Sequence, residues 1–396
     1  MCVTYVSLGE SSKDGRVIFG KVSDRLSDEI QLITHQPKSK FSKGEEIKCT
    51  HITIPQVTET AEILMSQPYW MFGCEMGCNQ YDVVIGNQSI ASKEPLKETG
   101  LLGMDLIRLG LERGKSAKEA LDIIIELLEK HGQGGVHNLK GVNQSNSFII
   151  ADSQEAYVLE AVGEWWIVEV VKNYRSISNH ISIRGKGDFR KKGIVEHAIE
   201  NDYCKDDEDF DFKTTFSKVP LPEKWPLDTR EGRSLNQLSV NNGEITPAMM
   251  MGFLREHEGG ICMHARSDRS VGCQVSHLHK NQTSVHWFTG STIQCLSIFK
   301  PYSLPYLGKY AIEPGPYTNI NPNWYWVRHD KYIKNYVKKP KQANPERNQY
   351  YQKLRNIEKE ILDKVEAIIS NSKNEVNKEL LTINNFSWEQ AEKLIH

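Results

Sequence analysis

The 396-residue sequence contains no uninterrupted apolar run long enough to span a bilayer. Its N-terminus also lacks the basic and then apolar pattern of a secretory signal peptide. Charge of one sign is missing as well, because 49 Lys and Arg residues face 51 Asp and Glu residues, for a net charge of −2. Such a balance provides no basic field for nucleic acid. These absences, with no internal repeat, predict a soluble cytoplasmic protein without a transmembrane segment or a nucleic-acid partner.

Cysteine is present but not abundant. Eight cysteines in a chain without an export signal are expected to be reduced thiols. One of them is notable for its position, because Cys2 directly follows Met1. Removal of Met1 would place a free α-amino group and a thiol on the same residue, and these groups titrate near pH ~7.7–8.0 and ~8.5. The neutral amine can then act as general base for the thiol, which would make Cys2 a self-contained nucleophile, although a second-position cysteine also occurs by chance.

The residues after Cys2 predict a β-hairpin. Residues 4–6 favour a strand, residues 11–15 read as a turn, and residues 17–19 begin a second strand. The end of that second strand, residues 20–25, carries charged and hydroxyl groups. The hairpin would deliver these groups beside Cys2.

The stretch MCVTYVSLGESSKDGRVIFGKVSDR (residues 1–25) resembles the opening of the secernins and their dipeptidase relatives. That family usually reads CDT-F-V-A followed by DGR-x-IFGKNSDR. Further similarities follow in the family's order, at WMFGCEMGCN (70–79), LLGMDLIRLGLER (101–113), HGQGG (131–135), NSFIIAD (146–152), ISNHISI (177–183) and FTGSTIQCLSIFKP (288–301). The ordered series is a specific signal, which no single motif would be.

The resemblance implies a cysteine-type N-terminal nucleophile (Ntn) hydrolase that cleaves dipeptides or other small amides through a Cys2 thioester. In this reading Asp24 holds the α-ammonium group and Lys21 is a cation beside the thiol. Without the resemblance, the two would read as a surface ion pair. No cofactor is implied.

Three further site residues come from the resemblance. Asn79, with a backbone N–H, would hold the oxyanion, and Asn179 would contact the reacting centre. Arg269, just before a predicted strand, would lie near the nucleophile, where a cation lowers the pKa of a thiol. From the residues alone, each asparagine could equally occupy a turn or a strand end.

Two positions depart from the family pattern. Val3 replaces the Asp that usually follows the cysteine, and Val22 replaces the Asn of GKNSDR. Either the substrate differs or the activity has faded. The alternative function is therefore a catalytically weak or silent secernin-like regulator of exocytosis that acts by binding proteins.

Periodicity predicts an α+β fold. Apolar residues at 3–4 spacing indicate two helices within 100–131, the second opened by a capping box at Ser116 and Glu119, and a third helix is expected over 246–256. Alternating residues over 147–183 indicate an antiparallel meander, and the last strands are expected at 285–289 and 296–299. Together with the resemblance, this predicts the αββα sandwich of Ntn hydrolases.

We expect a catalytic domain over residues 1–300, a Pro-rich connecting segment over 301–343 and a helical C-terminal extension over 344–396. An apolar stripe at 4-3-4-4-3 spacing marks the long helix of the extension. That stripe either packs against its own domain or forms a homodimer.

Potential metal ligands crowd one region. They are His257, Cys262, His264, Cys273, His277, His279 and His286. Zinc sites favour paired short spacings such as C-x-x-C, and here the later residues alternate along a predicted strand. Because no facing set of four is implied, the sequence predicts no metal site.

Overall fold

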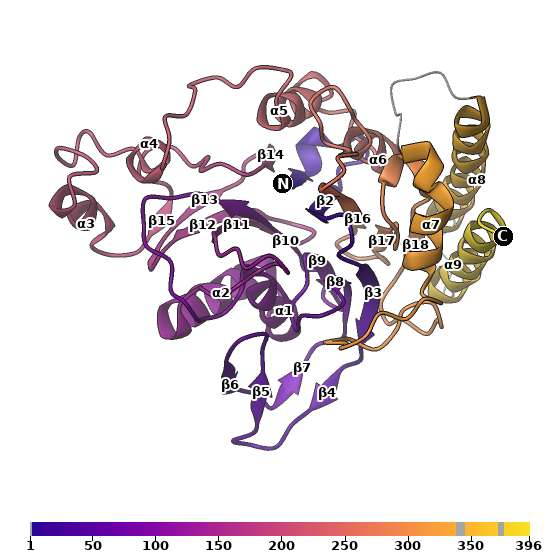
Figure 1. Ribbon diagram of the computed structural model, residues 1–396, viewed down its shortest axis with the longest axis horizontal. Coiled ribbons are helices and arrows are strands. Elements are labelled where there is room, and N and C mark those ends of the chain that lie inside the picture. The colour runs from indigo at the N-terminus through magenta and orange to yellow at the C-terminus, as the bar shows by residue number, and fades with distance from the viewer. Residues whose placement is uncertain (1, 338–344, 371–375) are drawn as a thin grey trace.

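The computed structural model describes residues 2–337, 345–370 and 376–396. Two antiparallel sheets lie face to face at its centre (Figure 1). The strands of the first sheet are, in spatial order, β14 (Tyr174–Ile177), β1 (Val3–Ser7), β2 (Val17–Leu26), β16 (Asp268–Leu278), β17 (Val285–Phe288) and β18 (Lys300–Tyr302). Those of the second are β15 (Phe189–Arg190), β13 (Trp165–Val170), β12 (Ala156–Val162), β11 (Ser145–Ala151), β10 (Val84–Ile90), β9 (Met76–Asn79), β8 (Ile63–Pro68) and β3 (Gln31–Gln36).

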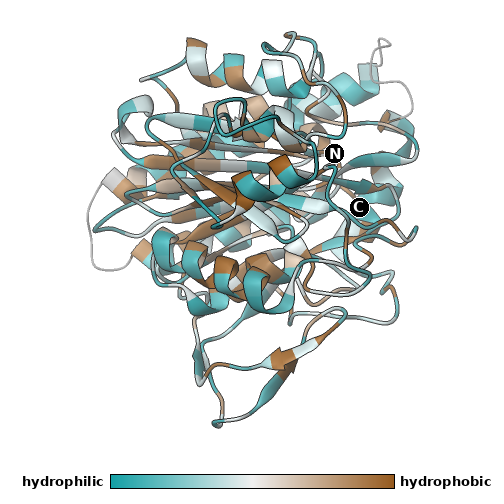
Figure 2. Ribbon diagram, turned by 90° about the vertical axis from the view of Figure 1, so that its left-hand side faces the viewer, coloured by the Kyte–Doolittle hydropathy of each residue, from teal (hydrophilic) through white to brown (hydrophobic). Residues whose placement is uncertain are grey.

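Helices cover the outer face of each sheet. α1 (Gly103–Arg113) and α2 (Ala117–His131) pack on the second sheet, and α5 (Arg230–Val240) and α6 (Pro247–Leu254) pack on the first. Figure 2 shows the apolar strands lying between the two helical layers. This arrangement is the αββα sandwich, so the expected fold is confirmed.

Helices α2 and α6 begin where their capping residues predict. The Ser116 hydroxyl accepts a hydrogen bond from the backbone N–H of Glu119 at the start of α2. Thr246 caps α6 in the same way, with Pro247 at the first helical position, where its missing N–H costs nothing. Each cap satisfies a backbone donor that has no partner within its helix.

Three apolar layers hold the sandwich together. Strand residues alternate between faces, so Phe19 and Ile149 enter the core between the sheets. Tyr5 joins the layer under α6, and Phe148 joins the layer under α1 and α2. Because both faces of the central strands are buried, their positions are fixed tightly, which suits a site built at strand ends.

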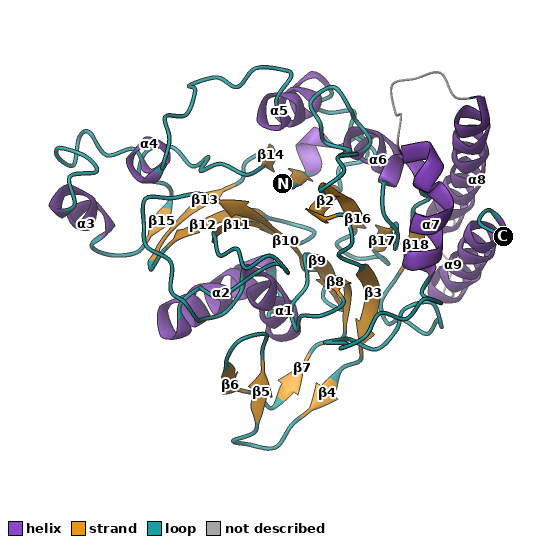
Figure 3. Cartoon of the chain, viewed as in Figure 1, coloured by secondary structure: helices purple, strands orange, loops and turns teal. Residues whose placement is uncertain are grey.

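Smaller elements surround the sandwich (Figure 3). Two short ribbons pair β4 (Ser39–Lys40) with β7 (Glu59–Thr60) and β5 (Glu46–Lys48) with β6 (Thr53–Pro55). The remaining short elements are η1 (Gly9–Ser11), α3 (Ile194–Glu200), α4 (Phe212–Phe216) and η2 (Gln294–Leu296). The strand expected at 296–299 is wrong, because Leu296 ends the 3-10 turn η2 and residues 297–299 do not pair in a sheet.

The C-terminal helices α7 (Tyr325–Val337), α8 (Pro345–Ser370) and α9 (Val376–Lys393) pack against their own chain. Buried Glu358 of α8 forms an ion pair with Arg255 at 2.6 Å, and Trp388 of α9 donates to the Tyr302 hydroxyl at 2.8 Å. The predicted connecting segment 301–343 contains α7, and residues 338–343 of it lie outside the described residues. A homodimer through α8 stays a prediction. In the part of the chain that the structure describes, no helix is long and apolar enough to cross a membrane.

Candidate active site

Cys2 lies at the start of β1, the strand between β2 and β14. Its side chain is 7% exposed, and its Sγ accepts a hydrogen bond from the backbone N–H of Asp24 at 3.3 Å. Asp24 is on β2, so the predicted hairpin does bring these two residues together. A thiol held at a strand end by its neighbouring strand has little freedom to leave that position.

The main chain of Cys2 is held by the turn that follows β14. Its backbone nitrogen donates to Asn179 Oδ1 at 2.7 Å, and the Ser178 hydroxyl donates to its carbonyl at 2.9 Å. Asn179 is itself oriented, because its Nδ2 donates to both the carbonyl and the hydroxyl of Ser89 at 2.9 Å. The structure therefore places Asn179 at the nitrogen that would become the α-amine.

Asp24 is buried and bonded on both carboxylate oxygens. The Ser270 hydroxyl donates to Oδ1 at 2.6 Å, and Arg230 forms an ion pair with Oδ2. Burial alone would lower the pKa of Arg230, but the Asp24 carboxylate outweighs it and the pKa is raised. Arg230 therefore stays a fixed positive charge close to Cys2.

No sequence motif marks Arg230. It occupies the first helical position of α5, within a polar stretch that carries no motif. Its partner Asp24 is 206 positions away in the chain. No local pattern distinguishes this arginine from the others near it, so only the tertiary structure reveals it.

A cavity of about 170 Å³ opens on the thiol side of Cys2. Its lining is rich in charge and includes Asp24, Arg25, Glu29 and Glu75. Arg25 pairs with Glu75 and donates to Glu29 Oε1 at 2.6 Å, so the three form a buried network. Among the described residues, no hydrogen-bond donor reaches the second oxygen, Glu29 Oε2. Glu29 lines the cavity, but this oxygen is itself buried, so a cationic group in the cavity would reach it only after a small turn of the side chain.

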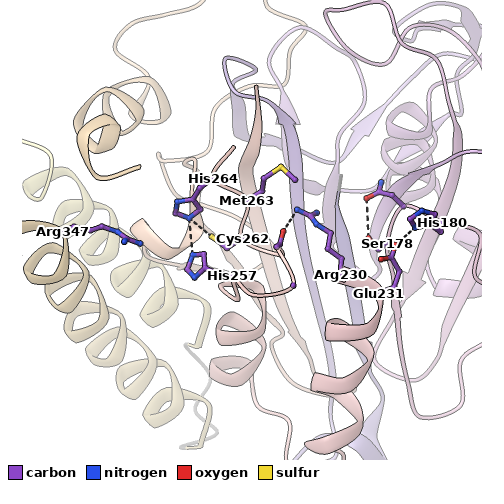
Figure 4. Close-up of a pocket in the computed structure, with 12 residues that line it drawn as sticks. Ser178, His180, Arg230, Glu231, His257, Cys262, Met263, His264 and Arg347 are labelled. Carbon is purple, nitrogen blue, oxygen red and sulfur yellow. Dashed lines mark hydrogen bonds and ion pairs between the residues drawn. The ribbon is translucent and has the colours of Figure 1, made fainter. Parts of the chain in front are cut away.

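A second cavity of about 550 Å³ lies on the other side of Asn179 and Arg230. In Figure 4, Ser178, His180 and Glu231 form one side of it, and His257, Cys262 and His264 gather on the opposite side, with Arg230 between them. His180 Nδ1 and Glu231 Oε1 are 2.5 Å apart. Burial raises the pKa of Glu231, but the hydrogen bond to His180 outweighs it and the net pKa is lowered. The larger cavity thus adjoins the residues that hold Cys2.

The remaining predicted residues have other partners. Lys21 is fully buried and contacts Glu75 at 3.5 Å. Asn79 donates to the carbonyls of Leu111 and Gly114 at 2.9 and 2.7 Å, so both of its amide hydrogens are used within the fold. Arg269 donates to the Ser27 carbonyl at 2.6 Å and forms an ion pair with Asp330 of α7. The structure does not bring Asn79 or Arg269 into the cavity that Cys2 lines.

A different asparagine lines that cavity. Asn87 is on β10, one strand beyond Asn79, and it borders the same space as Cys2. One of its amide hydrogens faces Asn146 Oδ1 at 3.1 Å, and the other faces the Met104 sulfur at 3.4 Å. Because a thioether is a weak acceptor, the second hydrogen can be given up to a stronger one.

The two departures from the family pattern lie opposite each other. Val3 on β1 pairs directly with Val22 on β2, and both belong to the apolar layer under α6. The polar pair of the family pattern is therefore replaced here by an apolar pair that packs on the helix side of the sheet. The two substitutions act as one structural change.

Residues 49–225 match the family model described as Peptidase family C69. This part of the chain is similar to that family. The match indicates a hydrolase of the cysteine-peptidase type. The C69 region supplies Glu75, Asn87 and Asn179 to the surroundings of Cys2, whereas Cys2 and Arg230 lie outside it.

Solved structures with weaker similarity to the chain are acylases and hydrolases. Penicillin V acylase from Agrobacterium tumefaciens is 14% identical, with a TM-score of 0.46, over 76% of this chain and 86% of the acylase. The C2A mutant of conjugated bile acid hydrolase from Clostridium perfringens is 11% identical, with a TM-score of 0.42, over 81% of this chain and 100% of the hydrolase. The Caenorhabditis elegans ortholog of N-acylethanolamine-hydrolyzing acid amidase is 11% identical, with a TM-score of 0.37, over 69% and 92%. Similarity this low assigns neither a substrate nor a residue's role to this chain.

Proposed function

We propose that Cys2 becomes the N-terminal nucleophile of an amidohydrolase once the residue before it is removed. The observation that carries this proposal is the set of contacts at Cys2, whose nitrogen is held by Asn179 and whose sulfur is held by Asp24. The buried Arg230–Asp24 ion pair fixes the second of these residues. Nucleophile and base then reside in one residue that the fold holds still.

The reaction proceeds in two halves. The α-amine of Cys2 takes the thiol proton, and the sulfur attacks the substrate carbonyl, whose π electrons move to oxygen. The protonated amine then passes its proton to the leaving nitrogen as the C–N bond breaks and a thioester forms. In the second half the amine takes a proton from water, the hydroxide attacks the thioester, and the C–S bond breaks to restore the thiol.

We assign the oxyanion contact to Asn87 rather than to Asn79. Asn87 lines the cavity that Cys2 lines and has an amide hydrogen on a weak acceptor, whereas both amide hydrogens of Asn79 are bonded to backbone carbonyls. An amide hydrogen aimed at the developing charge stabilises the tetrahedral intermediate. The Lys21 ammonium acts indirectly, because it pairs with Glu75, which lines the cavity.

The substrate we propose is a dipeptide or a small amide with a free amino group. The thiol-side cavity is small and carries the unbonded Glu29 oxygen, which would accept a substrate ammonium group. A cavity of about 170 Å³ favours a short substrate over a long peptide or a bulky acyl group. The Glu29 oxygen thus supports aminopeptidase-like recognition of a short substrate.

The first test is intact-protein mass spectrometry before and after a thiol-directed electrophile. We expect a chain that begins at Cys2 and takes up one label rapidly. Cys2→Ala should abolish the rapid label, whereas Cys204→Ser, a control at a buried cysteine of another region, should retain it. A chain that keeps Met1, or label spread evenly over the cysteines, would remove the hydrolase proposal.

A dipeptide panel then tests the substrate. Each dipeptide is offered with a free and with an N-acetylated amino group, and release of the second amino acid is measured. We expect turnover of the free forms and little of the acetylated ones, with no turnover by Cys2→Ala. Preference for the acetylated forms would contradict the role of Glu29.

A further inference from the structure

Four side chains that can ligate a metal meet beside the larger cavity. His257, Cys262, His264 and Cys295 place one ligand atom each within 4.8 Å of all the others. Three of the four come from one loop, and the fourth comes from η2. Of the cysteine and histidine residues between 257 and 286, only His257, Cys262 and His264 belong to the cluster. Cys295 lies outside that stretch of sequence.

The distances match the edges of a zinc tetrahedron. His264 Nε2 lies 3.3 Å from His257 Nε2, 3.3 Å from Cys262 Sγ and 3.2 Å from Cys295 Sγ. With Zn–N near 2.0 Å and Zn–S near 2.3 Å, a regular tetrahedron has edges of about 3.3 Å between nitrogens and about 3.5 Å between nitrogen and sulfur. The three distances from His264 Nε2 are within a few tenths of an ångström of these edges, and the other three lie within 4.8 Å, so small side-chain movements would surround an ion.

Hydrogen bonding among the four groups does not account for this arrangement. A single imidazole nitrogen either donates one hydrogen or accepts through one in-plane lone pair. His264 Nε2 nevertheless faces three polar atoms at once, two of them on buried cysteines. Several ligand atoms that converge on one point have the geometry of a cation site.

We propose that His257, Cys262, His264 and Cys295 bind a structural zinc ion. Two thiolates and two neutral imidazoles form a donor set that zinc favours in closed, four-coordinate sites. The thiols release their protons to solvent on binding. The two thiolate charges balance the ion, so no net charge is left in the wall of the cavity.

The loop that carries the ligands is held in place independently. The Cys262 backbone nitrogen donates to the Glu256 carbonyl at 2.7 Å, and the Arg255 side chain donates to the Gln294 carbonyl, next to Cys295, at 3.0 Å. Gly260, with φ at +73°, makes the turn between His257 and Cys262. These bonds fix the ligand-bearing segments relative to each other before a metal arrives, as supporting contacts do in metal sites.

The same loop also bears on Asp24. The Gly260 carbonyl accepts a hydrogen bond from Arg230, and the Met263 backbone nitrogen donates to the Ser270 hydroxyl at 3.0 Å. Arg230 and Ser270 both bond to the Asp24 carboxylate. A zinc ion at this position would therefore hold the scaffold around Cys2 without taking part in the reaction.

Metal content of the full-length protein, purified with a reductant and without chelator, tests the proposal. After exposure to zinc and dialysis into metal-free buffer, we expect one zinc per chain by mass spectrometry of the metal. Cys295→Ser and Cys262→Ser should lose it, and Cys204→Ser should keep it. Cys2→Ala should also keep it, so that failure of the zinc site and failure of the hydrolase proposal are distinguishable.

A ligand variant at the surface guards against loss of folding. His257 is exposed, so His257→Ala should fold normally and bind zinc at least tenfold more weakly, whereas His131→Ala, at the end of α2, should bind normally. Cobalt in place of zinc should give the visible bands of a tetrahedral site and a sulfur-to-cobalt band, both lost in Cys262→Ser. Folded wild-type protein without zinc, zinc equal in all variants, another metal bound instead, or a Cys262–Cys295 disulfide in reductant would each overturn the proposal.

Discussion

Replacement of Arg230 by methionine tests how the buried ion pair supports Cys2. Both residues are good helix formers, so the change at the start of α5 removes mainly the guanidinium. Asp24 would lose its ionic partner in a buried place, and the Gly260 carbonyl would lose its donor. Loss of one partner of a buried pair costs about 3–5 kcal/mol. We expect the free energy of unfolding to fall by that amount.

The assay is urea unfolding at pH 7.5, with Lys118→Met as matched control. Lys118 is likewise in the first turn of a helix and pairs with an aspartate, but this pair is exposed. Its Nζ lies 2.6 Å from Asp122 Oδ1. Exposed pairs contribute about 0–1 kcal/mol. If Arg230→Met costs no more than Lys118→Met, the buried pair does not hold the site as described.

The double variant separates stability from reactivity. Asp24→Asn combined with Arg230→Met leaves no uncompensated buried charge, so its loss of unfolding free energy should be smaller than the sum of the two single losses. Labelling of Cys2 should nevertheless be slower in the double variant than in the wild type, because the ionic anchor at position 24 is absent. A double variant that labels at the wild-type rate would show that the ion pair is merely structural.

Four further outcomes follow from other residues. Burial raises the pKa of Asp82 from 3.8 to about 6, so its charge destabilises the fold above that pH and not below about pH 4, where folded and unfolded states are both protonated. Asn tolerates the φ of +64° at this position. Asp82→Asn should therefore raise the free energy of unfolding by up to about 3 kcal/mol at pH 8 and hardly at pH 4. An equal gain at the two pH values would contradict this. Glu29→Gln should raise KM for free-amino dipeptides about tenfold with kcat little changed, since a charged hydrogen bond of at least about 1.5 kcal/mol is lost, and an unchanged KM would exclude the contact. Asn79→Ala should lower the midpoint of thermal unfolding and leave kcat unchanged. Asn87→Ala should lower kcat about 10²-fold or more at little cost in stability. The opposite pattern would return the oxyanion role to Asn79. Zinc removal by a chelator should slow Cys2 labelling several-fold in site-resolved mass spectrometry, and an unchanged rate would separate the metal site from the nucleophile.

The local parts of the fold could be predicted because short stretches of sequence specify them. The capping box at Ser116 fixes the start of α2, and the alternation over 147–183 predicts the meander that β11 to β13 form, although β14 crosses to the other sheet and pairs with β1. The hairpin signal after Cys2 also places Asp24 against it. Each of these features rests on the backbone periods of helix, strand and turn, which neighbouring residues establish among themselves.

Local sequence does not distinguish Asn79 from Asn87 as the residue beside Cys2. Asn79 and Asn87 lie on adjacent strands of the same sheet, and either reads locally as a polar residue at a strand. Which one borders the Cys2 cavity depends on how the two sheets stack. The register of one sheet against the other is a long-range property that no local motif encodes.

The sequence by itself determined the class of fold, the hairpin that brings Asp24 to Cys2, and the resemblance to a family of hydrolases. Only the tertiary structure decided that Arg230 meets Asp24 across 206 positions, and that Cys295 joins His264 across 31. The physical reason is that backbone periodicity is written in neighbouring residues. Contacts between distant segments arise only when the packed layers bring α5, the 257–264 loop and η2 to the same end of the sheet.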